Sequence, residues 1–197
     1  MERADQGLAF MLQYENIAWY DAGEVRILDR RAYPTKVEFV RCKTHGEVAQ
    51  AIADMVTQSA GPYTAAAMGM ALAAHECETL SANAQLEYLE DAAYTLSHAR
   101  PTTAARMELV TGGCLNAAKR VLEAGESAPD AIVRHAVAAN NLRYDKIHRM
   151  AEYLVDMFPN GGGVMTQCFG ETIVGQMLKV ARERRKKIHL YCPETRP

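Results

Sequence analysis

Residues 161–191, GGGVMTQCFGETIVGQMLKVARERRKKIHLY, are the most informative stretch of this chain for its fold class. The short apolar run 164–168 is typical of a buried strand, residues 172–185 are expected to be helical, and 188–191 reads as a second strand. A strand, a helix and a strand within about 30 residues form a βαβ unit, which joins two parallel strands. We therefore interpret residues 160–197 as the start of a Rossmann-like, doubly wound domain.

Such a unit is incomplete by itself, because a stable α/β layer needs more strands and helices on both faces. The remainder of the sheet is absent from the 197 residues. A second polypeptide completes it, or the chain is a fragment, or a dimer partner covers it.

The preceding residues, 1–159, are predicted to form an α+β domain made of a short β-hairpin and a helical bundle. The loop Pro159-Asn160-Gly161-Gly162-Gly163 is the predicted domain boundary, and we interpret its glycines as a hinge because no GxGxxG motif is present. The overall fold class is therefore α/β. The predicted strands are 17–20, 24–28 and 37–42, and the predicted helices begin at Thr44, Pro62, Ser81 or Asn83, Pro101 and near Pro129.

Composition excludes several classes of protein. Apolar residues make up 49% of the 197 residues, charged residues 23%, and the net charge is −2, which argues against a strongly basic nucleic-acid binder. The basic run 182–187 is interpreted as a charged helix end rather than a nucleic-acid patch. No apolar run approaches the roughly 20 residues that cross a bilayer, and no secretory signal is visible, so a cytoplasmic protein without membrane contact is expected.

The five cysteines lie at scattered positions with no CxxC pair and no metal-ligand spacing. Reduced thiols, no disulfide framework and no metal site are therefore expected. Cys168 differs from the rest because it ends a predicted parallel strand just before a helix, at the edge where α/β sheets bind ligands. A helix N-terminus favours a thiolate, and Gly170 would let a ligand approach. The alternative is a buried cysteine beside the sheet.

Arg100 precedes a helix start in the segment Ala99-Arg100-Pro101-Thr102-Thr103. Free N–H groups and the helix dipole favour an anion there, so Arg100 with Thr102 or Thr103 is a candidate phosphate site. A solvated arginine beside a threonine cap is the alternative, and the residues themselves leave both open.

Five stretches, taken in order, resemble the N-terminal part of the methylthioribose-1-phosphate isomerase family, whose fold is shared by the alpha, beta and delta subunits of translation initiation factor 2B. They are Ile17-Ala18-Trp19-Tyr20 with Val25-Arg26-Ile27-Leu28-Asp29, Ala51-Ile52-Ala53-Asp54-Met55 with Gly61-Pro62, Ala99-Arg100-Pro101-Thr102-Thr103, Val164-Met165-Thr166-Gln167-Cys168, and Pro193-Glu194-Thr195-Arg196-Pro197.

The resemblance implies an aldose–ketose isomerase that converts a ribose 1-phosphate derivative to a ribulose 1-phosphate derivative, as in methionine salvage, with no cofactor. It implies that Cys168 acts as an acid/base residue, that Arg100 binds the substrate phosphate, and that Gly61 and Pro62 belong to the first substrate loop. The aspartate that pairs with this thiol lies farther along the family's fold, beyond these 197 residues. A homodimer, or a complementary C-terminal chain, is the expected partner.

One departure from the family puts the exact substrate in doubt. The family's Arg-Gly-Ala-Pro loop reads here Ser59-Ala60-Gly61-Pro62, so an arginine expected to bind phosphate is absent. The alternative function is a non-catalytic, initiation factor 2B-like regulatory or ligand-binding subunit, or an inactive fragment. Cys168 together with Arg100 favours the isomerase, because a pure binding subunit needs no reactive thiol.

Overall fold

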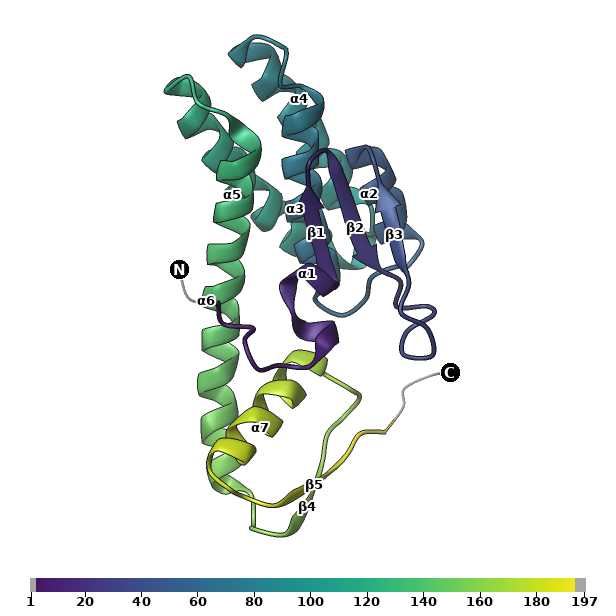
Figure 1. Ribbon diagram of the computed structural model, residues 1–197, viewed down its shortest axis with the longest axis vertical. Coiled ribbons are helices and arrows are strands. Elements are labelled where there is room, and N and C mark those ends of the chain that lie inside the picture. The colour runs from purple at the N-terminus through teal and green to yellow at the C-terminus, as the bar shows by residue number, and fades with distance from the viewer. Residues whose placement is uncertain (1–2, 194–197) are drawn as a thin grey trace. The chain divides into compact units, whose positions relative to one another are not determined.

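The computed structural model describes residues 3–193, and its contacts divide the chain into two compact units. Residues 14–139 form one, here called the helical unit; residues 1–13 and 140–197 form the other, here called the βαβ unit (Figure 1). The division falls inside the long helix α6 (Ala128–Met157). This division by contacts does not test the domain boundary predicted after residue 159, which stays a prediction.

The helical unit contains a three-stranded antiparallel sheet in the order β1-β2-β3. Its strands are Ala18–Asp21, Glu24–Leu28 and Phe39–Cys42, so the predicted hairpin and third strand are confirmed. Ala22 and Gly23 both have positive φ, 45° and 87°, the combination that a tight two-residue hairpin turn requires. One face of this sheet is buried, and the side chains that alternate along the strands to form it are Ala18, Val25, Ile27 and Cys42.

Helices make up most of the rest of this unit. Thr44 accepts a hydrogen bond from the Glu47 N–H at 3.2 Å, and Ser81, not Asn83, caps α4. Pro101 opens the 3-10 turn η2, which runs directly into α5 at Ala104, so the helix expected from Pro101 begins with a 3-10 turn. The bounds are α1 Tyr14–Ile17, α2 His45–Ala53, α3 Gly61–Glu76, α4 Ala82–His98, η2 Pro101–Thr103 and α5 Ala104–Glu123.

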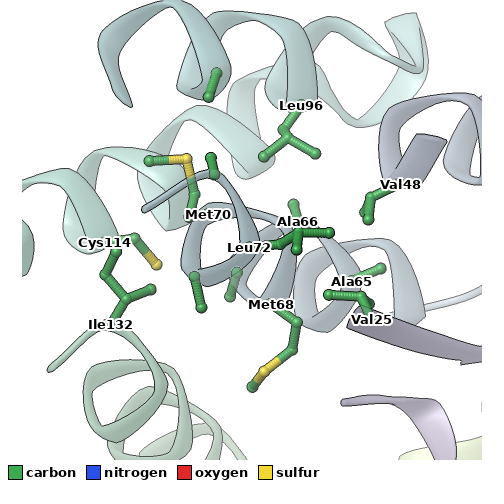
Figure 2. Close-up of a cluster of buried hydrophobic side chains, with 14 of the residues drawn as sticks. Val25, Val48, Ala65, Ala66, Met68, Met70, Leu72, Leu96, Cys114 and Ile132 are labelled. Atoms are coloured by element: carbon green, nitrogen blue, oxygen red, sulfur yellow. The ribbon is translucent and has the colours of Figure 1, made fainter. Parts of the chain in front are cut away.

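Helix α3 is the core of the helical unit. It contacts α2, α4, α5 and the sheet, and only Tyr63, His75 and Glu76 of its residues are not buried. Its alanines and Gly69 let these elements approach closely: a Cβ at Gly69 would lie 2.8 Å from Leu96 Cδ2 and 3.0 Å from Val48 Cγ1. Figure 2 shows α3 side chains meeting those of the surrounding helices and of β2. A helix that is apolar on every side has to be enclosed in this way.

The βαβ unit pairs β4 (Gly162–Met165) with β5 (Ile188–Tyr191) in parallel, joined by α7 (Glu171–Glu183). The predicted βαβ order is confirmed, but β4 begins earlier than expected. Gly162 and Gly163 pair with Ile188 and His189, so the hinge interpretation of these glycines was wrong. Short side chains suffice there because the backbone ladder itself orders the segment.

One face of this small sheet packs against a cluster from α6 and α7. Its buried members are Ala151, Val155, Val174, Met177, Val180 and Ala181, with Ile188 and Leu190 against it. On the other face Met165 is 73% exposed and Tyr191 58% exposed. The N-terminal segment also belongs to this unit, and its 3-10 turn η1 (Phe10–Leu12) packs on α7.

The mixed helix and strand architecture confirms the predicted α/β class. Within residues 3–193 no helix is long and apolar enough to cross a membrane.

Candidate catalytic and phosphate-binding residues

Cys168 lies in the loop 166–170 between β4 and α7, with its side chain exposed. The expectation that it ends the strand was wrong, because the ladder with β5 stops at Met165 and the chain turns away after Thr166, whose N–H donates to Tyr191 O at 3.0 Å. The exposed position also rules out the alternative of a buried cysteine beside the sheet. The thiol is accessible to a ligand ahead of α7.

The backbone of Cys168 has a φ of 64°, in the left-handed region that non-glycine residues seldom adopt. Such a conformation costs roughly 1–2 kcal/mol, so the surroundings have to hold it. The Thr166 hydroxyl does so in part by donating to Cys168 O at 2.8 Å. This turn sets the direction in which the thiol leaves the backbone.

Gly170 and Glu171 complete the approach to α7. Gly170 is the N-cap and offers no side-chain cap, while its carbonyl accepts the Val174 N–H at 3.0 Å. Glu171 in the first turn is buried, only 7% exposed. The dipole at the start of α7 favours an anionic or electron-rich substrate group near Gly170, whereas the Glu171 carboxylate in the same turn opposes it.

The second candidate site is in the helical unit, where Arg100 has an extended backbone before Pro101. The Thr103 N–H and hydroxyl both donate to Arg100 O, at 3.1 and 3.3 Å. Thr103 is thus occupied in shaping the turn, and exposed Thr102 is the threonine that stays available to a ligand. The half-buried Arg100 has no ion pair with any residue in the part of the chain described.

Gly61 and Pro62 begin α3 in the same unit. The Gly61 N–H donates to Gln58 O at 2.9 Å, Pro62 has no N–H, and the Tyr63 N–H donates to Ala60 O at 3.3 Å. A Cβ at Gly61 would lie 1.9 Å from Thr57 Oγ1, so the glycine is required for the close turn. These residues shape the start of α3, but their backbone donors are already used.

Sequence reasoning missed Arg106, which lies in the first turn of α5. Its guanidinium carbon is 6.0 Å from the centre of the Tyr63 ring, in the first turn of α3. No local pattern links residues 63 and 106. Only the parallel arrangement of α3 and α5, each antiparallel to α4, brings the two helix starts together.

The predicted residues fall in both units. Cys168 and Gly170 belong to the βαβ unit, whereas Gly61, Pro62, Arg100 and Thr102 belong to the helical unit. Each group is therefore described by itself, and their assembly into one site stays a prediction. The motif that follows Pro193 lies outside the described residues.

Other titratable groups have structural roles. Burial raises the pKa of Cys42 to about 11 and that of Cys114 to about 12, so both stay protonated thiols in the core. Glu76 accepts hydrogen bonds from the His45 N–H at 2.6 Å and the Tyr88 hydroxyl at 2.6 Å, which ties α2, α3 and α4 together.

In the basic run 182–187, Arg184 pairs with Asp156, and Lys186 donates to Val155 O, which favours the charged-helix-end interpretation. No group of three His, Cys, Asp or Glu side chains within 3–193 is arranged to hold a metal.

These features define an α/β protein in which an exposed thiol precedes one helix and two arginines flank the start of another. Residues 57–197 match the Initiation factor 2 subunit family, and the chain belongs to that family. The resemblance noted in the sequence is thereby confirmed.

Relatives of this chain carry isomerase names. The chain is 31% identical to a "Methylthioribose-1-phosphate isomerase" of Roseiflexus castenholzii, over 91% of this chain and 54% of that protein. It is 30% identical to a "Putative methylthioribose-1-phosphate isomerase" of Archaeoglobus fulgidus, over 92% and 55%. The chain thus spans about half the length of these relatives.

Two solved structures share the fold. The delta subunit of translation initiation factor eIF-2B from A. fulgidus superposes with a TM-score of 0.75 at 27% identity, covering 92% of this chain and 55% of that one. The 5-methylthioribose 1-phosphate isomerase from Pyrococcus horikoshii superposes with a TM-score of 0.64 at 24% identity, covering 87% and 50%, and supports the fold alone.

Proposed function

We propose that this chain carries one part of the active site of an aldose–ketose isomerase that acts on a ribose 1-phosphate derivative, of the methylthioribose-1-phosphate isomerase type. The observation that carries the proposal is the exposed Cys168 on a constrained turn ahead of α7. The names of the relatives support the same reaction class.

The chemistry needs proton transfers and no outside oxidant or reductant. Opening the sugar ring breaks the C1–O4 bond and leaves a proton on O4. The hydrogen on C2 then moves to C1 while the C2 hydroxyl gives up its proton to a base, so that C2 is oxidised to a ketone and C1 is reduced. Two acid/base groups with different proton affinities suit these steps.

Cys168 is assigned one of these two roles. Its thiol is exposed in the loop before α7, where the helix dipole favours developing negative charge and the nearby Glu171 opposes it. The second group is assigned to an aspartate from the part of the family's fold outside these 197 residues. Arg100, with Thr102, is assigned to the phosphate, because a guanidinium forms paired hydrogen bonds with phosphate oxygens.

The alternative is a non-catalytic regulatory or ligand-binding subunit. Two observations favour it: the closer superposition on the delta subunit and the absence of any charge in residues 57–62. A homodimer or a complementary chain is proposed as partner under either function.

The intact mass and subunit composition of the native protein are the first measurements. An isomerase of this type is expected to purify with the counterpart of the relatives' other half, in the same or a second polypeptide. If the 197-residue chain is found alone, folded and stable, the binding or regulatory function takes precedence.

The preparation so defined is then assayed for ketose formation from 5-methylthioribose 1-phosphate and ribose 1-phosphate. Cys168→Ser is expected to lower kcat about 10²–10⁴-fold, the usual contribution of a general acid or base. Cys192→Ser, which alters a partly buried cysteine of the same unit, is the matched control and should keep wild-type turnover. Wild-type turnover in Cys168→Ser would contradict the proposal.

A further inference from the structure

We infer that the βαβ unit carries a second ligand site, in a cavity walled by the N-terminal segment, α6 and α7, and that this site binds a small hydroxylated anion, a phosphorylated or carboxylated polyol. The cavity has a volume of about 620 Å³, within the range of small-molecule sites. None of its lining residues belongs to the Cys168 loop or to the helical unit. The inference therefore goes beyond the proposed function and does not rest on it.

Gln176 of α7 carries the inference. This residue is only 1% exposed, and its side chain lines the cavity. Its Oε1 lies 2.9 Å from Nδ1 of His148 in α6, whereas its amide nitrogen has no hydrogen-bond partner within residues 3–193. Buried amides are nearly always satisfied, because the loss of their hydration is otherwise uncompensated. A ligand oxygen in the cavity would complete this one.

The groups beside Gln176 on α6 are acceptors. When Nδ1–H of His148 donates to Gln176 Oε1, the other ring nitrogen, Nε2, is the acceptor of the neutral imidazole. Asp145, three residues earlier, adds a carboxylate to the cavity wall, and it has no ion pair in the part of the chain that the structure describes. Both acceptors need donors from a ligand, and the hydroxyl groups of a polyol supply them.

Two cations of α7 give the cavity its preference for an anion. Lys179 lines it and donates from Nζ to Gln6 O at 3.1 Å, a partner that leaves the ammonium charge unneutralised. Arg182, three residues further along the same face of α7, lies beside the wall, since a Cβ at Gly7 would be 3.8 Å from its Nη2. Neither cation has an ion pair with a described residue. Their charges match a phosphate or carboxylate group.

The walls of the cavity are held in place by hydrogen bonds of the chain itself. The N-terminal segment crosses α6 and reaches α7 (Figure 1). Two buried side chains of α6 hold it: Asn141 Oδ1 accepts the Ala4 N–H at 3.0 Å, and the Tyr144 hydroxyl donates to Leu12 O at 2.9 Å. A site fixed in this way loses little conformational freedom when a ligand binds.

The remaining lining residues restrict the ligand further. No aromatic ring lines the cavity, and Ala4 is its one apolar side chain. Arg3 also lines it, but the guanidinium pairs with the buried Asp5. A nucleobase or a large apolar group therefore finds no surface on which to stack, whereas a compact polyol with one anionic group finds donors, acceptors and positive charge.

The test is a titration of the full chain with glycerol 3-phosphate, gluconate and inorganic phosphate, followed by the His148 ring signals in proton–carbon NMR spectra. The variant His148→Gln identifies those signals. Both hydroxylated anions are expected to shift them with dissociation constants of about 1 mM or lower, and the tighter one shows which anionic group is preferred. Inorganic phosphate should bind about two- to tenfold more weakly, because it lacks the polyol hydroxyls. Equal binding of inorganic phosphate would overturn the assignment of a polyol.

Two variants of α7 test the residues that carry the inference. Lys179→Met keeps the apolar stem without the charge and should weaken both hydroxylated anions about tenfold or more. Gln176→Met keeps the side-chain length without the amide and should weaken them about two- to tenfold, the size of one hydrogen bond. Lys146→Met is the matched control, because Lys146 is an exposed lysine of α6 outside the cavity lining. Its affinity should stay within about twofold of the wild type, since a distant surface charge is screened.

Melting curves and far-UV circular dichroism show whether each variant is folded. If Gln176→Met does not fold, Lys179→Met decides the question, because its side chain is only partly buried. Wild-type affinity in Lys179→Met would overturn the inference.

Arg100→Ala and Cys168→Ser separate this cavity from the proposed active site. If either variant weakens binding of the anions while Lys179→Met does not, the ligand occupies the proposed active site and the inference is wrong. If Lys179→Met weakens binding while Cys168→Ser keeps wild-type turnover, the cavity site stands and the isomerase proposal is wrong. If neither hydroxylated anion shifts the His148 signals at concentrations up to about 10 mM, the inference is overturned directly.

Discussion

Helices α3 and α7 bury their apolar residues in different ways. Helix α3 is enclosed on all sides by elements of the helical unit, and a Cβ added at Gly69 would meet side chains of both α2 and α4. Helix α7 is amphipathic, and the two-stranded sheet beside it is covered on one face only, with Met165 and Tyr191 exposed on the other. Complete enclosure makes α3 a scaffold, whereas the βαβ unit, open on one face, also presents the exposed Cys168.

The largest expected effect tests whether α3 is the better packed region. Leu96 is fully buried against Gly69, so Leu96→Ala is expected to lower the unfolding free energy by about 3 kcal/mol. Leu190→Ala, in β5 where the residue is only partly buried, should cost no more than about 1 kcal/mol. Urea unfolding followed by circular dichroism measures both; equal losses would contradict the comparison.

A smaller effect is expected from adding a methyl group where α3 meets its neighbours. Gly69→Ala forces Leu96 and Val48 apart and should lower the unfolding free energy by about 1–3 kcal/mol. Gly112 in α5 is the control, because a Cβ there meets nothing within 4 Å. Gly112→Ala should raise the unfolding free energy by about 0.5–1 kcal/mol through helix propensity alone. If Gly69→Ala has the same unfolding free energy as the wild type, the close packing of α3 is contradicted.

The smallest expected effect is a pH dependence within the helical unit. Burial, assisted by the charge of Arg120, lowers the pKa of His135 from its ordinary value of 6.5. The unfolded chain then binds the proton more readily than the folded one, so this group removes stability as the pH falls below about 6.5. His135→Gln should lose less unfolding free energy than the wild type between about pH 7.5 and pH 5.5. Thermal or urea unfolding measures both proteins; equal losses of unfolding free energy in the wild type and His135→Gln would contradict this assignment.

Much of the fold was predictable because its signals are local. The turn Asp21-Ala22-Gly23, the Thr44 and Ser81 caps and the periodicity of the long helices each depend on a few neighbouring residues. The βαβ order was predictable for the same reason. The start of β4 was not, because glycines join a strand only when a partner such as β5 supplies the ladder.

The candidate site was predictable in part. Arg100 and Cys168 were singled out from short motifs; the structure leaves Cys168 exposed and Arg100 half-buried, and their roles stay predictions. The assignment of Gly61 and Pro62 to a substrate loop stays a prediction, and the hydrogen bonds that occupy the turn before α3 could not be read from residue types. The N-terminal elements η1 and α1 were missed because they are too short for periodicity to show.

Local order, hydrophobic pattern and the motif residues were thus determined by the residue sequence, since propensity and periodicity act over one or two turns of chain. The exposure of Cys168, the close approach at Gly69 and the meeting of Arg106 with Tyr63 were decided by tertiary structure. The last of these joins residues 43 positions apart through two antiparallel helix packings. Such a contact depends on how whole helices pack against one another, and no local pattern encodes it.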